Sequence, residues 1–176
     1  MTDTRTQLLD AAEHSMRKRG YHAVSFRDLA DELGIKSASV HYHFRQKEDL
    51  GVALVQRYAS HVLAALELKA SGADSPAARF SAFKEVYRDA LVTSDEICLC
   101  GMLGAEALGL PDVVAAEVRR FFEANVTWLM EAQSDTTPED ERRQRALHIV
   151  AALQGAMMLA STLGDFGVFD EIADRI

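Results

Sequence analysis

The sequence predicts an all-α protein of about nine helices, and three observations support this class. Along the 176 residues, apolar side chains recur three and four positions apart, which is the spacing of one helix face. No stretch sustains the apolar–polar alternation of a β-strand. The chain contains only 3 Pro and 10 Gly, so few residues interrupt long periodic segments.

The first helix is expected to end at Gly20. Leu8, Ala12 and Met16 share one face, which predicts burial of that face. The basic run at residues 17–19 suits the negative end of a helix dipole, and glycine commonly follows the last turn.

A pair of short helices is expected next. Ser25, with Asp28 three positions later, resembles a capping box, with Asp in place of the usual Glu or Gln. That helix should break at Gly34, and a third helix is expected from Ser37 to Phe44. The further helices are expected from Lys47 past Leu66, from Pro76 past Leu91, from Met102 to Leu108, from Pro111 past Leu129, from Pro138 to about Leu163, and around Phe169 and Ile172.

The segment 146–163 is almost wholly apolar and nearly as long as a membrane span. It is rich in Ala, however, and carries His148 and Gln154, so we expect burial in a core or between subunits. Its small side chains would let a second backbone approach closely; they are Ala151, Ala152, Gly155, Ala156 and Ala160. We therefore expect a homodimer formed through about residues 138–176, and no membrane.

Composition and charge narrow the class of protein. Hydrophobic residues make up 48% of the chain, enough for a globular core, and 2 Cys do not form a disulfide framework. The polar start has no apolar core of a secretory signal, which predicts a cytoplasmic protein. Residues 1–50 carry eight basic and eight acidic side chains, so the net charge of −8 lies in the remainder. An acidic protein can still bind nucleic acid if its basic groups share one face.

Residues 25–50 carry the clearest functional pattern. Two short helices joined by a tight turn that contains glycine have the form of a helix-turn-helix. Small side chains open the second helix, at residues 37–39, and would let it lie deep in a major groove. The donors His41, Tyr42, Arg45 and Lys47 follow. The alternative is a helical adaptor protein whose helix-turn-helix is degenerate and binds no DNA.

This region resembles the N-terminal domain of TetR/AcrR-type transcriptional regulators. The resemblance rests on residues in matching order and spacing: Gly20-Tyr21, Ser25, Asp28-Leu29-Ala30, Gly34-Ile35, Val40-His41-Tyr42-His43-Phe44 and Lys47-Glu48-Asp49-Leu50. It implies a DNA-binding domain at 1–46 and a ligand-binding and dimerisation domain at 47–176. It further implies a homodimer that binds a palindromic double-stranded operator, usually as a repressor, and is released by a small-molecule effector.

By position, the resemblance implies DNA contacts from Ser25, Arg27, Lys36, Ser37, Ala38, Ser39, His41, Tyr42 and Lys47. Lys36 stands where the family often has Ser, and His41 where Tyr is usual. Both differences affect the operator sequence that would be read.

Candidates for an effector site are apolar or aromatic: Phe83, Tyr87, Cys98, Met102, Phe121, Trp128 and Met157. At helical spacing such residues are also ordinary core. Residues 98–106 are similar to a segment in one branch of the family in which some members carry a cysteine that detects electrophiles or oxidants. Cys98 is therefore a candidate sensor, with core packing as the alternative, since a reactive thiol needs a basic neighbour or a helix N-terminus.

Enzyme motifs are missing from the sequence, which has no Gly-rich phosphate loop, no Gly-x-Ser-x-Gly and no metalloprotease His pair. The pairs His41/His43 and Cys98/Cys100 are two residues apart, so on a helix they would not face the same side. We expect no enzyme activity, no metal and no cofactor.

Overall fold

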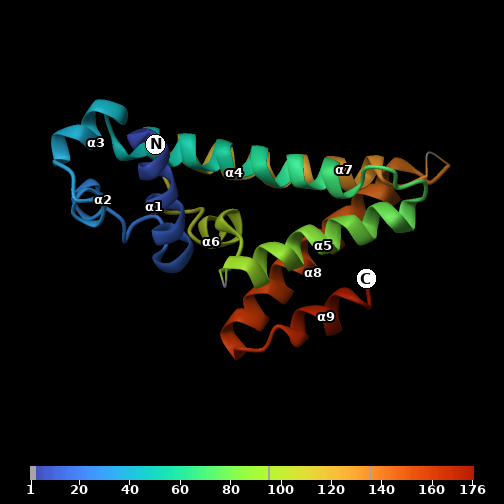
Figure 1. The fold of residues 1–176 in the computed structure, drawn as a ribbon. Helices are drawn as coiled ribbons and strands as arrows, with labels where there is room; N and C mark the ends of the chain where they lie inside the picture. Colours follow the sequence, from blue (N-terminus) through green and yellow to red (C-terminus); the bar gives the residue numbers. More distant parts are fainter. Residues whose placement is uncertain (1–2, 95, 135) are drawn as a thin grey trace. The chain divides into compact units, whose positions relative to one another are not determined.

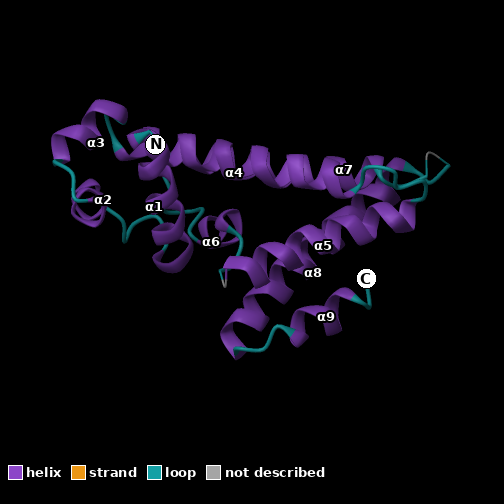
Figure 2. Ribbon diagram, viewed as in Figure 1, coloured by secondary structure: helices purple, strands orange, loops and turns teal. Residues whose placement is uncertain are grey.

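The computed structural model describes residues 3–94, 96–134 and 136–176, and all regular structure in them is α-helical (Figure 2). Nine helices lie in these residues: α1 (Thr4–Arg19), α2 (Phe26–Leu33), α3 (Ser37–His43), α4 (Lys47–Lys69), α5 (Pro76–Ser94), α6 (Leu99–Ala105), α7 (Asp112–Glu131), α8 (Glu139–Leu163) and α9 (Gly167–Ala173). The all-α class and the predicted number of helices are confirmed.

The helices form two compact units. The first contains the chain up to Tyr58 together with Leu99–Arg119, and the second contains Ala59–Cys98 and Arg120–Ile176. Helices α4 and α7 each begin in the first unit and end in the second. The division of function after residue 46 stays a prediction.

In the first unit, α1 packs against α2 and α6, and α2 packs against α3 (Figure 1). The face of α1 predicted from periodicity is buried, since Leu8, Ala12 and Met16 are fully inaccessible to solvent. Gly20 ends α1 with φ of 80°, and its amide donates to the Met16 carbonyl oxygen at 2.9 Å. The first predicted helix is thus confirmed in its face and its end.

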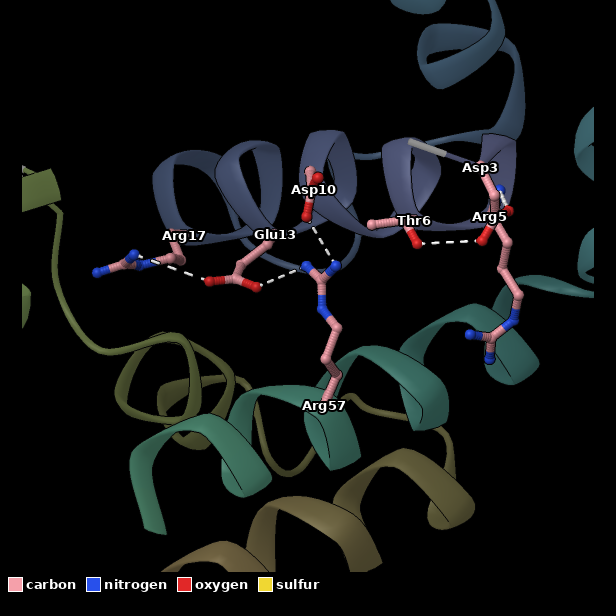
Figure 3. A network of polar contacts seen from close by, with 7 residues as sticks. All are labelled: Asp3, Arg5, Thr6, Asp10, Glu13, Arg17 and Arg57. Atoms are coloured by element: carbon pink, nitrogen blue, oxygen red, sulfur yellow. Dashed lines mark hydrogen bonds and ion pairs between the residues drawn. The ribbon is translucent and has the colours of Figure 1, made fainter. Parts of the chain in front are cut away.

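One arginine fastens α4 to α1 (Figure 3). The guanidinium of Arg57 donates from Nη1 to Asp10 Oδ1 at 2.7 Å and from Nη2 to Glu13 Oε2 at 2.9 Å. Glu13 also faces Arg17 at 4.0 Å, one turn further along α1. Because one planar fork reaches two carboxylates a turn apart, the contact fixes the sliding and the rotation of α4 against α1.

In the second unit, α8 packs against α5 and α9 (Figure 1). One side of α8 is buried, through Ala146, Ile149, Val150, Leu153, Ala156, Met157 and Ala160. Helix α9 is tied to α5 by a bidentate ion pair between Arg88 and Asp170, at 2.6 and 2.9 Å, and by Lys84 Nζ donating to the Ala173 carbonyl at 3.1 Å. The C-terminal helix is therefore held by polar as well as apolar contacts.

By length and composition alone, α8 is the one helix in the described residues that could cross a membrane. This is weak evidence, because the core helix of a water-exposed protein passes the same test. Two of the small residues expected to admit a partner's backbone, Ala156 and Ala160, instead face the core of their own chain. Ala151 is exposed and Gly155 is half-buried.

Several predicted boundaries were wrong, since Phe44 lies just past α3 and Pro111 just before α7. The helix expected at 102–108 begins at Leu99 instead, because Leu99, Cys100 and Leu103 form its buried face, and the chain leaves it in turns after Ala105. Pro138 precedes α8 rather than opening it, and no side chain caps that end. The Ser75–Pro76 start is confirmed, since the Ala78 amide donates to Ser75 Oγ at 3.2 Å.

Candidate nucleic-acid interface

The start of α2 is fixed by the capping box that the sequence predicts. The Asp28 amide donates to Ser25 Oγ at 3.2 Å, and the Ser25 amide donates to Asp28 Oδ2 at 3.0 Å. The Ser25 hydroxyl also donates to Asp28 Oδ2 at 2.7 Å. Hydrogen bonds from the Ser25 hydroxyl, and then from its amide, hold the pKa of Asp28 below its ordinary value. Ser25, a candidate phosphate contact, therefore first serves to begin the helix.

The turn between α2 and α3 depends on a left-handed glycine. Gly34 has φ of 64° and ψ of 29°, and its amide donates to the Asp31 carbonyl at 3.3 Å. The next amide, of Ile35, donates to the Ala30 carbonyl at 3.0 Å. This pair of bonds is a Schellman motif, which reverses the chain without leaving the last carbonyls of α2 unpaired. The predicted helix-turn-helix is thus built by local hydrogen bonds.

Helix α3 has one buried side and one solvent side. Val40 is inaccessible to solvent and Phe44, just past the helix, is 3% exposed. The candidate residues lie on the other side, where Lys36, Ser37, Ala38, His41 and Tyr42 are exposed and Ser39 is half-buried. The structure therefore leaves these candidates accessible to solvent, whereas Val40 and Phe44 face the core.

Tyr42 stands out on this surface, because 85% of it is exposed. Its ring meets the edge of His43 at a centroid distance of 5.1 Å, and the ring of His41 meets Phe26 of α2 at 5.0 Å. Covering an exposed aromatic ring with a partner lowers the free energy, provided that the hydroxyl at its tip keeps a hydrogen bond. The surface is chemically suited to contact both apolar and hydrogen-bonding groups in a groove.

The basic candidates differ in their availability. Arg27 is exposed, and its 3.9 Å ion pair with Asp31 joins two exposed side chains, so it holds the guanidinium only weakly. Lys47 is half-buried, with its ammonium 4.3 Å from the centre of the Tyr21 ring. Desolvation lowers the pKa of Lys47, although the carboxylates of Glu106, Glu48 and Asp28 act in the opposite direction. Lys47 is therefore part of the packing as well as a candidate contact.

The candidates for an effector site do not form one group. Phe83 stacks on Tyr87 at 5.0 Å and lies 5.6 Å from Trp128, all three buried. Tyr87 Oη donates to Asn125 Oδ1 at 3.2 Å, and Asn125 Nδ2 donates to the Phe121 carbonyl at 2.7 Å.

The other three candidates do not all lie in the same unit as this cluster. Cys98 and Met157 are buried in the same unit, whereas the half-buried Met102 belongs to the first unit. In the described part of the chain, no three His, Cys, Asp or Glu side chains gather as metal ligands would.

Sequence reasoning missed the contact between Tyr21 and Glu106. The Tyr21 amide donates to Glu106 Oε2 at 2.7 Å, across 85 residues of sequence. No local pattern signals such a contact, because it depends on how α6 packs against α1.

Comparisons with known proteins agree with this geometry. Residues 8–54 match the family model described as bacterial regulatory proteins, tetR family. A segment of 74 residues is 38% identical to the HTH-type transcriptional repressor KstR2 of Rhodococcus jostii, covering 42% of this chain and 36% of that protein. This match therefore spans little more than a third of the relative's length.

Solved structures are similar over nearly the whole chain. A TetR transcriptional regulator from Legionella pneumophila is 28% identical, with a TM-score of 0.93 over 99% of this chain and 96% of that one. A TetR-family regulator from Agrobacterium tumefaciens is 26% identical, with a TM-score of 0.87 over 98% of this chain and 96% of that one.

Proposed function

Because the chain is a TetR-family transcriptional regulator with a DNA-binding helix-turn-helix, we propose that it binds a palindromic operator as a homodimer and lets go when a small molecule binds. The observation that carries this proposal is the exposed polar side of α3, with Tyr42 projecting into solvent. Residues 1–46 bind the operator, and residues 47–176 hold the effector and the second copy. The protein acts in the cytoplasm.

Helix α3 reads bases from the major groove in this proposal. Ser37, Ala38 and Ser39 are short enough to bring its backbone close to the base edges, and Tyr42 reaches further with ring and hydroxyl. Arg27 and Lys36 bind phosphates on either side, and His41 and Ser25 add hydrogen bonds at the groove edge.

The dimer forms through the solvent side of α8. Four large apolar residues of α8 are exposed in the single chain: Leu147, Met158, Leu159 and Leu163. A two-fold dimer would cover this surface in both copies at once, which is the ordinary fate of an exposed apolar patch. The two α3 helices would then address half-sites about 34 Å apart or a multiple of that.

The effector binds in the second unit, beside the aromatic cluster of Phe83, Tyr87 and Trp128. Tyr87 Oη is paired with Asn125 and Trp128 Nε1 with the Glu67 carboxylate, so the rings remain as the main contact surface, and we propose an apolar or weakly polar effector. The similar Rhodococcus protein is named a repressor, and we propose the same direction of regulation here.

Two alternatives have less support. A helical adaptor protein would not need the exposed polar residues of α3, nor an α3 whose N-terminus lacks a side-chain cap. An electrophile sensor needs an accessible thiol, whereas Cys98 is 2% exposed and Cys100 is fully buried. Electrophile-driven release from DNA that disappears in Cys98→Ser would favour the sensor.

Selection from a pool of random DNA duplexes tests the proposal. The purified protein should enrich a sequence with two inverted half-sites, and its affinity for that sequence should fall steeply with added salt. Enrichment of no palindrome, or binding that ignores sequence at every salt concentration, would contradict operator recognition.

A further inference from the structure

The turn that follows α1 is hydrogen-bonded to a carboxylate just past the C-terminus of α6. Glu106 lies just past α6, and its Oε2 accepts a hydrogen bond from the Tyr21 amide at 2.7 Å. This short bond to an ionised acceptor is of the stronger kind. A second bond runs nearby, between His22 Nε2 and the Gly109 carbonyl oxygen at 3.0 Å.

The contact between this turn and the Glu106 carboxylate requires glycine at position 20. Its φ of 80° is a conformation that other residues rarely adopt. A Cβ atom at this position would also collide with the Glu106 carboxylate. The turn thus places bare backbone against the carboxylate, which indicates a contact that a longer side chain would prevent.

The side chain of Tyr21 completes the junction. Its ring is 2% exposed and lies under the Lys47 ammonium of α4. A Cβ added at Gly51 of α4 would stand 3.0 Å from the Tyr21 ring and 3.0 Å from Val114 of α7. Amide and ring together therefore join the turn after α1 to α4 and to Glu106, just past α6.

The connectivity of the chain gives this junction a consequence. Residues 99–119 belong to the first unit and include α6 and the start of α7. They directly follow Cys98, which ends a segment of the second unit. They end at Arg119, inside α7. In the sequence, residues 99–119 therefore lie between two segments of the second unit. Glu106, one of these residues, holds the turn that leads into α2 and α3.

We propose that Glu106 is a positioning residue that locks the DNA-reading helices to residues 99–119 and so sets the half-site spacing that the dimer accepts. This inference rests on the proposed function. Without the bond, α1–α3 sample several orientations, and only a fraction of them matches the operator. The apparent affinity falls by that fraction, while operators of other spacing become less unfavourable.

The test compares Glu106→Ala with Glu106→Gln on the duplex selected by the wild-type protein. Each variant is also measured on duplexes whose half-sites are moved apart by one or two base pairs, each pair adding about 3.4 Å and about 35°. Glu106→Ala should bind the selected duplex about tenfold more weakly and lose discrimination between spacings on the order of fivefold. Glu106→Gln keeps an acceptor oxygen and should retain both values.

Three controls separate positioning from folding and charge. Glu106→Gln and Glu106→Ala lose the same charge, but only Glu106→Gln keeps an acceptor oxygen within reach of the turn. Glu117→Ala makes the same change in the same segment, but Glu117 accepts from Gln56 of α4 at 3.1 Å and not from the turn. It should keep the wild-type discrimination. Glu106→Asp, one methylene shorter, should behave like Glu106→Ala.

Amide hydrogen exchange at Tyr21 provides a readout that needs no DNA. Exchange should be about tenfold or more faster in Glu106→Ala than in Glu106→Gln. If the wild-type protein selects no paired half-sites, the proposed function fails while exchange still tests the bond. If it does select them and Glu106→Ala keeps the wild-type spacing preference, or if the Tyr21 amide exchanges equally in both variants, the inference is wrong.

Discussion

At the scale of single residues, Tyr42 is the side chain on which the proposed base recognition most depends. Because 85% of it is exposed, replacing it with Ala should not lower the free energy of unfolding. Specific binding to the selected operator should weaken by about 1–3 kcal/mol, whereas binding to random duplex should change little. Fluorescence anisotropy on both duplexes measures this, and Tyr42→Phe separates the ring from the hydroxyl. Equal losses on the two duplexes would assign Tyr42 to backbone contact.

Arg27 is predicted to bind a DNA phosphate, so its loss should weaken binding independently of sequence, unlike the loss of Tyr42. Its guanidinium is exposed and weakly paired with Asp31, so it is free to replace a counterion on DNA. Arg27→Ala should weaken binding to all sequences alike and lower the slope of log affinity against log salt by about one. Lys47→Ala should lower this slope less, because the Lys47 ammonium lies over the Tyr21 ring. An unchanged slope in Arg27→Ala would contradict the phosphate contact.

Tyr21 predicts a specific response to alkaline pH. Its hydroxyl is buried with no hydrogen-bond partner in the described residues, and burial, with a smaller effect of Glu48, raises the pKa of Tyr21 to about 12. The unfolded chain loses this proton near pH 10. The folded protein therefore binds more protons between these values, and its stability falls as pH rises from about 10 to about 12.

Tyr21→Phe should remove this loss, of about 2–3 kcal/mol at the upper end. At pH 7 the variant should be as stable as the wild type or more so, because no buried hydroxyl is left unpaired. Urea unfolding at pH 7, 10 and 11 compares the two proteins. Parallel loss of stability in both proteins across this range would show that Tyr21 does not titrate as described.

At the scale of elements, the attachment of α4 to α1 depends on the two-pronged contact of Arg57 (Figure 3). Arg57→Ala leaves Glu13 half-buried without this partner and should lower the free energy of unfolding by about 1–3 kcal/mol. Arg57→Lys should recover only part of the loss, because an ammonium cannot reach both carboxylates as a fork does. Arg143→Ala, which removes the same charge from an exposed position on α8, is the control in urea unfolding.

The elements also show which parts of the fold could be predicted from sequence. The capping box of Ser25 and the break at Gly34 are local, since each bond joins residues within six positions, and both predictions are confirmed. The boundaries of α6 were missed because its buried residues, Leu99, Cys100 and Leu103, are covered by residues distant in the sequence. Glu106 was missed for the same reason, since its partner lies 85 residues away.

At the scale of the whole molecule, the charge distribution favours one way of approaching DNA. Residues 1–50 are neutral, and the net charge of −8 belongs to the remainder of the chain. The acidic remainder repels phosphate, so the helix-turn-helix is the part that can approach it at low cost. A single copy of this segment, with no net positive charge, gives little affinity because it neutralises few phosphates. Two helix-turn-helix domains held together in a dimer bind a palindrome with far higher affinity than one. Loss of the dimer should therefore also abolish operator binding.

Met158→Arg tests that coupling. Met158 is 54% exposed on the side of α8 opposite the core, so an arginine there should not disturb the fold of one chain but would place two like charges in a two-fold interface. Sedimentation should show a monomer, and affinity for the palindrome should fall at least about a hundredfold toward that of one half-site. Leu68→Arg adds the same charge at an exposed apolar position on α4, outside residues 138–176, and should remain dimeric. A dimeric Met158→Arg that still binds its operator would exclude this side of α8 as the interface.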